Sequence, residues 1–195
     1  QIIVECKLNP EKEVLLNKIG KIIHRLPIIN SYVIEINKKD INELHGIIEI
    51  ETLYNNAHFT VQMDKARKIV KADIANDKGY TGKDVTVAVL DTGIHPVEDL
   101  TTPRNRILGF KDIVNNRREP YDDNGHGTHV AGIIAGNAAN SEGRYMGIAP
   151  EVNLVGVKIL DKDGRGSASD VLIGLQWVMD NTERFNIRIV NLSIG

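Results

Sequence analysis

The 195-residue sequence has a single cysteine, no long hydrophobic run and almost no net charge. Cys6 has no second cysteine to pair with, which excludes an internal disulfide. A lone cysteine in an apolar run is typical of a small buried side chain, the alternative being a reactive thiol. The net charge of −2 gives no reason to expect a nucleic acid or an acidic membrane as a partner.

The sequence also lacks recognisable targeting segments. No stretch is long and apolar enough to predict a membrane span. The N-terminus, Gln1-Ile-Ile-Val, has no basic region followed by a long apolar core, as a secretory signal would have. It has no initiator methionine either, so we expect upstream residues to have been removed. The compartment stays open, because both bacterial secreted enzymes and cytoplasmic ones lack disulfides.

The composition is 42% hydrophobic and 26% charged, which is ordinary for a globular protein of one or two domains. Residues 1–57 read as a small α+β domain. Alternation and helical spacing predict strands and helices in the order βαββαβ, a ferredoxin-like arrangement. The strands are expected over 2–8, 24–29, 32–36 and 47–53, and the helices over 10–23 and 40–45. The first helix would bury Val14, Leu15, Ile19, Ile22 and Ile23. A core this small is expected to be marginal alone.

Residues 54–62 resemble a linker. The second domain is expected over 58–195, and after the linker its sequence alternates between helices and strands. This alternation predicts an α/β domain with a parallel sheet and right-handed crossovers. Strands are expected over 85–90, 106–114, 152–160 and 187–194, and helices over 62–78, 126–139 and 169–185.

Two short segments carry the residues suited to chemistry. Asp91 follows an apolar strand, and parallel sheets place active sites at the carboxyl ends of their strands. Alone, such an aspartate is often only a turn residue or a helix cap. His126, between Gly125 and Gly127 at a helix start, strengthens the catalytic interpretation because a general base needs an orienting carboxylate. The aspartate precedes the histidine along the chain, which is the order found in one class of Asp-His-Ser hydrolases.

His129 lies three residues after His126 and shares its helix face. One hypothesis is a two-histidine metal site, with Asp122 or Asp123 as a third ligand. The favoured alternative is a packed, hydrogen-bonded histidine, because the segment lacks the glutamate of a hydrolytic zinc helix.

Five segments together resemble the subtilisin-like serine proteases, from about Gln62 to the end of the chain. In order, they are Val89-Leu-Asp-Thr-Gly93, His126-Gly-Thr-His-Val-Ala-Gly-Ile133, Gly147-Ile-Ala-Pro150, Val157-Lys-Ile-Leu160 and Val190-Asn-Leu-Ser-Ile-Gly195. The resemblance implies that Asp91 is the orienting acid and His126 the general base of a catalytic triad. His129 would be a family residue other than the base.

The same resemblance implies sites for substrate and metal. Gly164, Arg165 and Gly166 fall on one strand that clamps the substrate backbone, and Ser193, Ile194 and Gly195 on the other. Leu160 and Ala168 fall where the family shapes a pocket for a residue upstream of the cleaved bond. Asp99 falls on a position that often binds calcium, but the loop 137–145, which usually completes that site, matches poorly. The resemblance thus implies a structural calcium ion at Asp99, and the poor match of the loop argues against it. No cofactor is expected for the chemistry.

Residues 1–57 resemble the propeptide of these zymogens, which assists folding and then blocks the active site with an extended tail. That tail is expected over 51–57, with processing near 54–58. The family's oxyanion-hole asparagine and nucleophilic serine are expected beyond Gly195, so this chain alone is expected to be inactive. The expected partners are a protein or peptide substrate, the chain's own propeptide and the rest of the catalytic domain. The alternative function is a non-catalytic peptide-binding or regulatory pseudoprotease.

Overall fold

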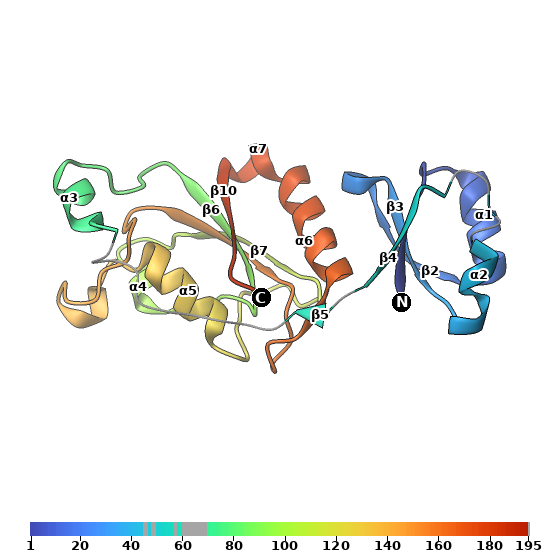
Figure 1. Cartoon of the computed structure of the whole chain (residues 1–195). Coiled ribbons are helices and arrows are strands. Elements are labelled where there is room, and N and C mark those ends of the chain that lie inside the picture. The colour runs from blue at the N-terminus through green and yellow to red at the C-terminus, as the bar shows by residue number, and fades with distance from the viewer. Residues whose placement is uncertain (45–46, 48–49, 57, 60–69, 195) are drawn as a thin grey trace.

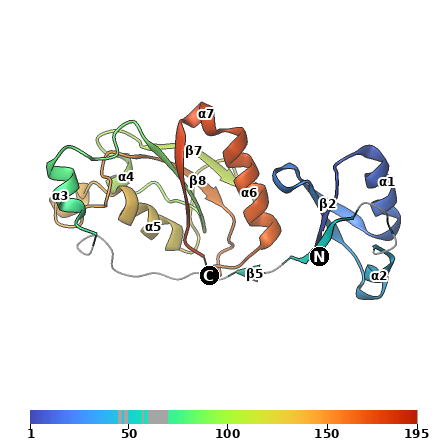
Figure 2. The same ribbon diagram turned by 45° about the horizontal axis from the view of Figure 1, so that its top comes forward.

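The computed structural model describes residues 1–44, 47, 50–56, 58–59 and 70–194. Within this part of the chain, the strands form two four-stranded sheets and one two-stranded ladder. The first sheet uses residues up to Asn55 and the second uses residues from Thr86 onward. Figure 1 shows the two sheets side by side, with helix α6 (Ala168–Asp180) between them, and Figure 2 shows the same arrangement from a second direction.

The first sheet is antiparallel and has the order β2-β3-β1-β4. Its elements follow the strand–helix–strand–strand–helix–strand order expected from the sequence. The strands are β1 (Ile2–Glu5), β2 (Lys21–Leu26), β3 (Ser31–Glu35) and β4 (Thr52–Asn55). The helices are α1 (Pro10–Ile19) and α2 (Ile41–Leu44), and the 3-10 turns η1 (Pro27–Ile29) and η2 (Lys38–Asp40) lie between elements. Residues 1–56 are called the N-terminal module below.

Helix α1 is shorter than the sequence predicted, and its buried face differs. Asn9 caps its start by accepting the Lys12 N–H at 2.8 Å, and the helix ends at Gly20. Leu16 is fully buried, whereas Val14 and Leu15 are exposed. The predicted face is wrong because the helix stops at Gly20, so that Ile22 and Ile23 belong to β2 beside β3. Cys6 is buried in the core under α1, as the small-hydrophobe interpretation predicted.

The second sheet is parallel and has the order β10-β6-β8-β7, which confirms the predicted α/β class. Its strands are β6 (Thr86–Asp91), β7 (Ile107–Asp112), β8 (Asn153–Lys158) and β10 (Ile187–Leu192). Side chains of β6 alternate between two cores. Val87 and Val89 pack with α5 (His126–Ala135), whereas Ala88 and Leu90 pack with α6. Covering both faces buries the strand that ends at Asp91.

Several predicted boundaries change around this sheet. The helix expected over 126–139 ends at Ala135, and the one over 169–185 divides into α6 and α7 (Thr182–Phe185). The helix expected over 62–78 is described only from residue 70 onward, where α3 (Ala72–Asp77) is a short helix with Ile74 exposed. The remaining short elements are α4 (Glu98–Thr101) and η3 (Ala139–Ser141). No helix in the described ranges has the length and apolarity needed to traverse a bilayer.

Residues expected to form a linker instead contact the second part of the chain. Strand β4 extends to Asn55, and Asn56 is buried. Asn56 Oδ1 accepts the Ser169 N–H at 2.7 Å, and its Nδ2 lies 2.7 Å from Ser169 Oγ. Next, β5 (His58–Phe59) pairs antiparallel with β9 (Gly166–Ser167). Within the segment 51–57, where a tail was expected, residues 52–55 instead pair with β1 inside the module, and residue 57 lies outside the described residues.

The module also packs on α6 through an apolar layer. Ile3, Leu26 and Val33 project from one face of the antiparallel sheet and are buried. They pack with Ala168, Leu172 and Ile173 of α6, together with Ile23 and Ile29. The opposite face of the same sheet packs on α1 and α2. One helix of the parallel-sheet region thus covers the face of the module that its own helices leave open.

Candidate active site

Asp91 ends strand β6 and its side chain is fully buried. Burial raises the pKa of its carboxyl, since the charged form loses solvation. Hydrogen bonds from His126 and from the Thr92 N–H act against this effect because both favour the charged form. The Thr92 N–H donates to Asp91 Oδ1 at 2.7 Å. The carboxylate is thus held by its own turn at the carboxyl end of the sheet.

His126 is the first residue of α5, and its Nδ1 lies 2.8 Å from Asp91 Oδ1. The side chain is 12% exposed, while that of Asp91 is 0% exposed. A carboxylate that accepts a hydrogen bond from Nδ1–H keeps the proton on that nitrogen and fixes the ring orientation. Nε2 is then the nitrogen that can accept a proton. The structure therefore brings together the two residues that the sequence selected, 35 positions apart.

Two glycines let the strand end and the helix start approach this closely. A Cβ added to Gly127 would strike the Gly93 carbonyl oxygen and crowd the Cβ of Asp91. Gly93 has a φ of +122°, and a Cβ there would strike the Tyr121 carbonyl oxygen. The Gly127 N–H instead donates to Thr92 Oγ1 at 2.9 Å. Backbone proximity therefore sets the separation of Asp91 and His126.

Asp122 organises the start of α5. Its carboxylate accepts the N–H groups of Asn124, Gly125 and Thr128 at 2.8–3.1 Å, as well as the hydroxyls of Thr92 and Thr128. Burial by itself would raise the pKa of Asp122. The hydrogen bonds outweigh burial and hold the pKa below its ordinary value. This carboxylate is thus charged and fixes the turn that carries the histidine.

The two-histidine metal hypothesis gains no support from this arrangement. His126 faces Asp91, Asp122 accepts backbone N–H groups, and Asp123 lies 2.7 Å from the ammonium of Lys158. His129 is exposed, so the expectation of a packed histidine is also wrong. Within the described ranges, no three His, Cys, Asp or Glu side chains gather as metal ligands would.

Asp99, the expected calcium ligand, has other partners. Its Oδ1 accepts the Asn140 N–H at 2.7 Å. Its backbone carbonyl accepts the Asn137 N–H and a guanidinium N–H of Arg106. A cation on that carbonyl disfavours a second positive charge beside it. Among the described residues, those that surround Asp99 do not gather as a set of calcium ligands, and no chemical step depends on one.

The expected substrate-binding residues fall in two places. Leu160 is fully buried after β8, Gly164 turns the chain with a φ of +74°, and Gly166 begins β9. The Asp161 N–H donates to the Arg165 carbonyl, which closes this loop. The expected pocket residue Ala168 packs with the N-terminal module.

The second expected substrate strand follows β10. Ser193 accepts a hydrogen bond from Asn191 Nδ2 at 3.0 Å, and Ile194 packs against the α6 core. Gly195 lies outside the described residues.

Three residues have structural roles that the sequence alone does not reveal. The sequence analysis assigned no role to Lys158. It considered Asp122 as a metal ligand, and it placed Asn56 in a linker. A lysine inside the apolar strand Val157-Lys-Ile-Leu160 is a visible signal, because buried strands rarely carry an unpaired charge. Asn56 offers no such signal, since its partners Gln1 and Ser169 lie 55 and 113 residues away.

Comparison with known proteins agrees with this geometry. A model described as "Subtilase family" matches residues 82–195. Serine protease AprX of Bacillus subtilis is 44% identical over 162 residues, covering 78% of this chain and 36% of that protein. A thermostable alkaline protease of Halalkalibacterium halodurans is 35% identical over 172 residues (87% and 44%). Subtilisin E of Bacillus subtilis is 31% identical over 189 residues (95% and 47%).

The chain spans less than half the length of these three curated relatives. The matching model covers more than half of the chain and contains both Asp91 and His126. The relatives are subtilisins and other proteases, and their similarity extends across most of these residues. The chain is part of a subtilisin-like serine protease and belongs to the subtilase family.

Proposed function

We propose that this chain is the N-terminal part of a serine endopeptidase zymogen that hydrolyses peptide bonds with an Asp-His-Ser triad. The observation that carries the proposal is the 2.8 Å contact between His126 Nδ1 and the fully buried Asp91. A binding protein has no need for a general base whose second nitrogen is held by a buried carboxylate. Asp91 and His126 are the proposed catalytic residues within this chain.

In the proposed mechanism, His126 Nε2 takes the hydroxyl proton of a nucleophilic serine as that oxygen attacks the peptide carbonyl. Asp91 stabilises the resulting imidazolium, and the proton then passes to the leaving amine. The serine and the oxyanion-stabilising asparagine are proposed to come from the rest of the longer protein. Residues 1–195 by themselves are therefore proposed to be inactive.

Residues 1–57 are proposed to be the propeptide, a ferredoxin-like inhibitor and folding assistant, with the catalytic domain starting at residue 58. The βαββαβ order supports this proposal, as does the apolar layer against α6. The β5–β9 ladder adds a further argument, because β9 includes Gly166 of the proposed substrate-clamping strand. A segment of the chain's own occupies that strand edge, as an inhibitory tail would.

The same ladder moves the proposed processing site. Cleavage before Asn56 would cut β4 or separate it from the Asn56 anchor, and cleavage at the later bonds of 54–58 would leave β5 outside the propeptide. Since the segment paired with β9 is His58–Phe59, we propose cleavage after Phe59, which moves the proposed start of the catalytic domain from residue 58 to residue 60. The mass of the released N-terminal fragment in the complete protein measures this position directly.

The test of the proposed function compares the complete protein with its His126→Ala and Asp91→Asn variants. We expect the native protein to process itself and to hydrolyse peptides, and each variant to lose at least about 10⁴-fold in kcat. Native protein that is folded but binds peptides without cleaving them would support the pseudoprotease alternative instead. Normal processing of His126→Ala would contradict the assignment of the base.

A further inference from the structure

The ammonium of Lys158 is a fully buried charge at the carboxyl end of β8, next to the strand that ends at Asp91. Burying an ammonium is unfavourable unless its donors are satisfied by well-placed acceptors. Nζ donates to the carbonyls of Thr92 at 2.6 Å and Leu160 at 2.7 Å, and to Asp123 Oδ1 at 2.7 Å. It also lies 5.3 Å from the ring centroid of Tyr121. All three protons therefore have acceptors, and each acceptor lies on a different segment.

Two of those segments carry the candidate catalytic pair. Thr92 follows Asp91, and its own N–H donates to the Asp91 carboxylate. Thr92 Oγ1 accepts the Gly127 N–H at the start of α5. Asp123 follows Asp122, the carboxylate that organises the turn before His126. Lys158 thus joins the turn after the acid to the loop before the base.

We propose that Lys158 is a positioning residue that sets the geometry of the Asp91–His126 pair by tethering the Thr92 carbonyl to Asp123. The proposal deepens the proposed function and rests on it for its kinetic consequences. Lys158 does not touch the reacting atoms in this account. It acts through Thr92, whose carbonyl accepts a hydrogen bond from Nζ and whose own N–H, on the preceding peptide group, donates to Asp91 Oδ1.

Lys158→Met in the complete protein removes the ammonium while keeping much of the side-chain volume. We expect kcat to fall about 100-fold with KM changed less than about twofold, because a small misplacement of catalytic groups acts on the chemical step. We also expect the far-downfield NMR signal of the Asp91–His126 hydrogen bond to be lost or broadened. Lys83→Met, at an exposed lysine before β6, is the matched control and should change neither readout.

Asp123→Asn covers the case in which Lys158→Met does not fold. It removes the charge from one end of the tether and leaves both carbonyl acceptors in place. We expect about a tenfold loss in kcat and a shifted downfield signal. Unchanged kcat and an unchanged signal in a folded Lys158→Met, or in Asp123→Asn if the former is unfolded, would overturn the proposal. If the native protein hydrolyses no peptide, the proposed function fails, and the NMR signal alone decides on the tether.

Discussion

The Asp91–His126 pair and the N-terminal module meet the same α/β scaffold through different kinds of contact. The pair depends on one hydrogen bond between groups fixed by backbone proximity at Gly127 and Gly93. The module depends on an apolar layer against α6, a short ladder and one polar anchor at Asn56. The Asp91–His126 geometry should be lost when a single carbon is added at Gly127 or Gly93. The contact between the module and α6 should weaken gradually as individual contacts are removed.

Gly127→Ala is expected to have the largest effect. The added Cβ would strike the Gly93 carbonyl and crowd Asp91, both of which belong to the rigid strand end. Helix α5 must shift to make room, so we expect a loss of about 1–3 kcal/mol in the free energy of unfolding. We also expect at least about 100-fold lower kcat. Chemical denaturation and peptide hydrolysis of the complete protein measure the two effects.

Gly132→Ala is the matched control in the same helix. A Cβ there meets no atom within 4 Å, and alanine favours helix over glycine by up to about 1 kcal/mol. We therefore expect unchanged kcat and equal or greater stability. Equal losses in the two variants would show that α5 tolerates no alanine at either site and would refute the argument from Gly127.

Asn56→Ala should lower stability by a comparable amount, but it ranks second because it acts on the module's contact and not on the Asp91–His126 pair. It leaves the buried Ser169 N–H without its side-chain acceptor, which costs about 1–3 kcal/mol. We expect faster hydrogen exchange at the start of α6 and a lower unfolding midpoint in urea. Asn37→Ala removes a hydrogen bond that is exposed, and serves as the control. An unchanged exchange rate at Ser169 in Asn56→Ala would show that the anchor contributes nothing.

Acid should loosen the turn that carries His126. Because the folded pKa of Asp122 lies below its ordinary value of 3.8, the stabilisation it gives is complete above that pH. It is lost as the pH falls through the lower folded value. We expect Asp122→Asn to be less stable than the native protein near neutral pH, with a shallower further loss below pH 3.8. Parallel stability curves over that range would contradict this account.

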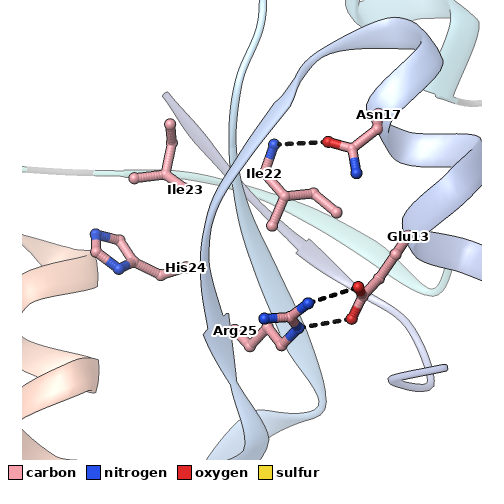
Figure 3. A pocket seen from close by; sticks show the side chains of 6 residues that line it. All are labelled: Glu13, Asn17, Ile22, Ile23, His24 and Arg25. Atoms are coloured by element: carbon pink, nitrogen blue, oxygen red, sulfur yellow. Dashed lines mark hydrogen bonds and ion pairs between the residues drawn. The ribbon is translucent and has the colours of Figure 1, made fainter. Parts of the chain in front are cut away.

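The smallest effect is expected at the Glu13–Arg25 pair on the outer side of the module. Two hydrogen bonds of 2.6 Å join the side chains beside a cavity of about 410 Å³. Figure 3 shows Arg25 pointing from β2 toward Glu13 on α1, while His24 projects away from them on the other side of β2. Because exposed ion pairs contribute little, Arg25→Ala should leave the urea midpoint and the processing rate unchanged. A clear loss of processing would show that this pair is coupled to α6.

The sequence predicted the site best where a short motif lies at the end of a regular strand or at the start of a helix. Asp91 and His126 could be paired in advance because the end of a buried strand and a glycine-flanked helix start are both readable as local patterns. Lys158 was readable as a charge in an apolar strand, but its three acceptors depend on how loops fold back over the sheet. The spacing of apolar residues along the chain does not predict such contacts between loops.

Prediction was weaker in the N-terminal module for a physical reason. The apolar residues between Val14 and Ile23 follow helical spacing, but the pairing of β2 with β3 takes Ile22 and Ile23 out of the helix. The supposed linker failed as a prediction because its polar residues have long-range partners. Asn56 and β5 contact residues 166–169, which lie more than 100 positions further along the chain.

The most direct test of the central claim is fluorophosphonate labelling of the complete protein, read by intact mass and by peptide mapping. The account predicts one covalent adduct on a serine outside residues 1–195. It also predicts that His126→Ala and Asp91→Asn slow its formation severely. No adduct on folded, processed protein, or an adduct that forms equally fast in both variants, would contradict the assignment of Asp91 and His126 to a serine protease triad.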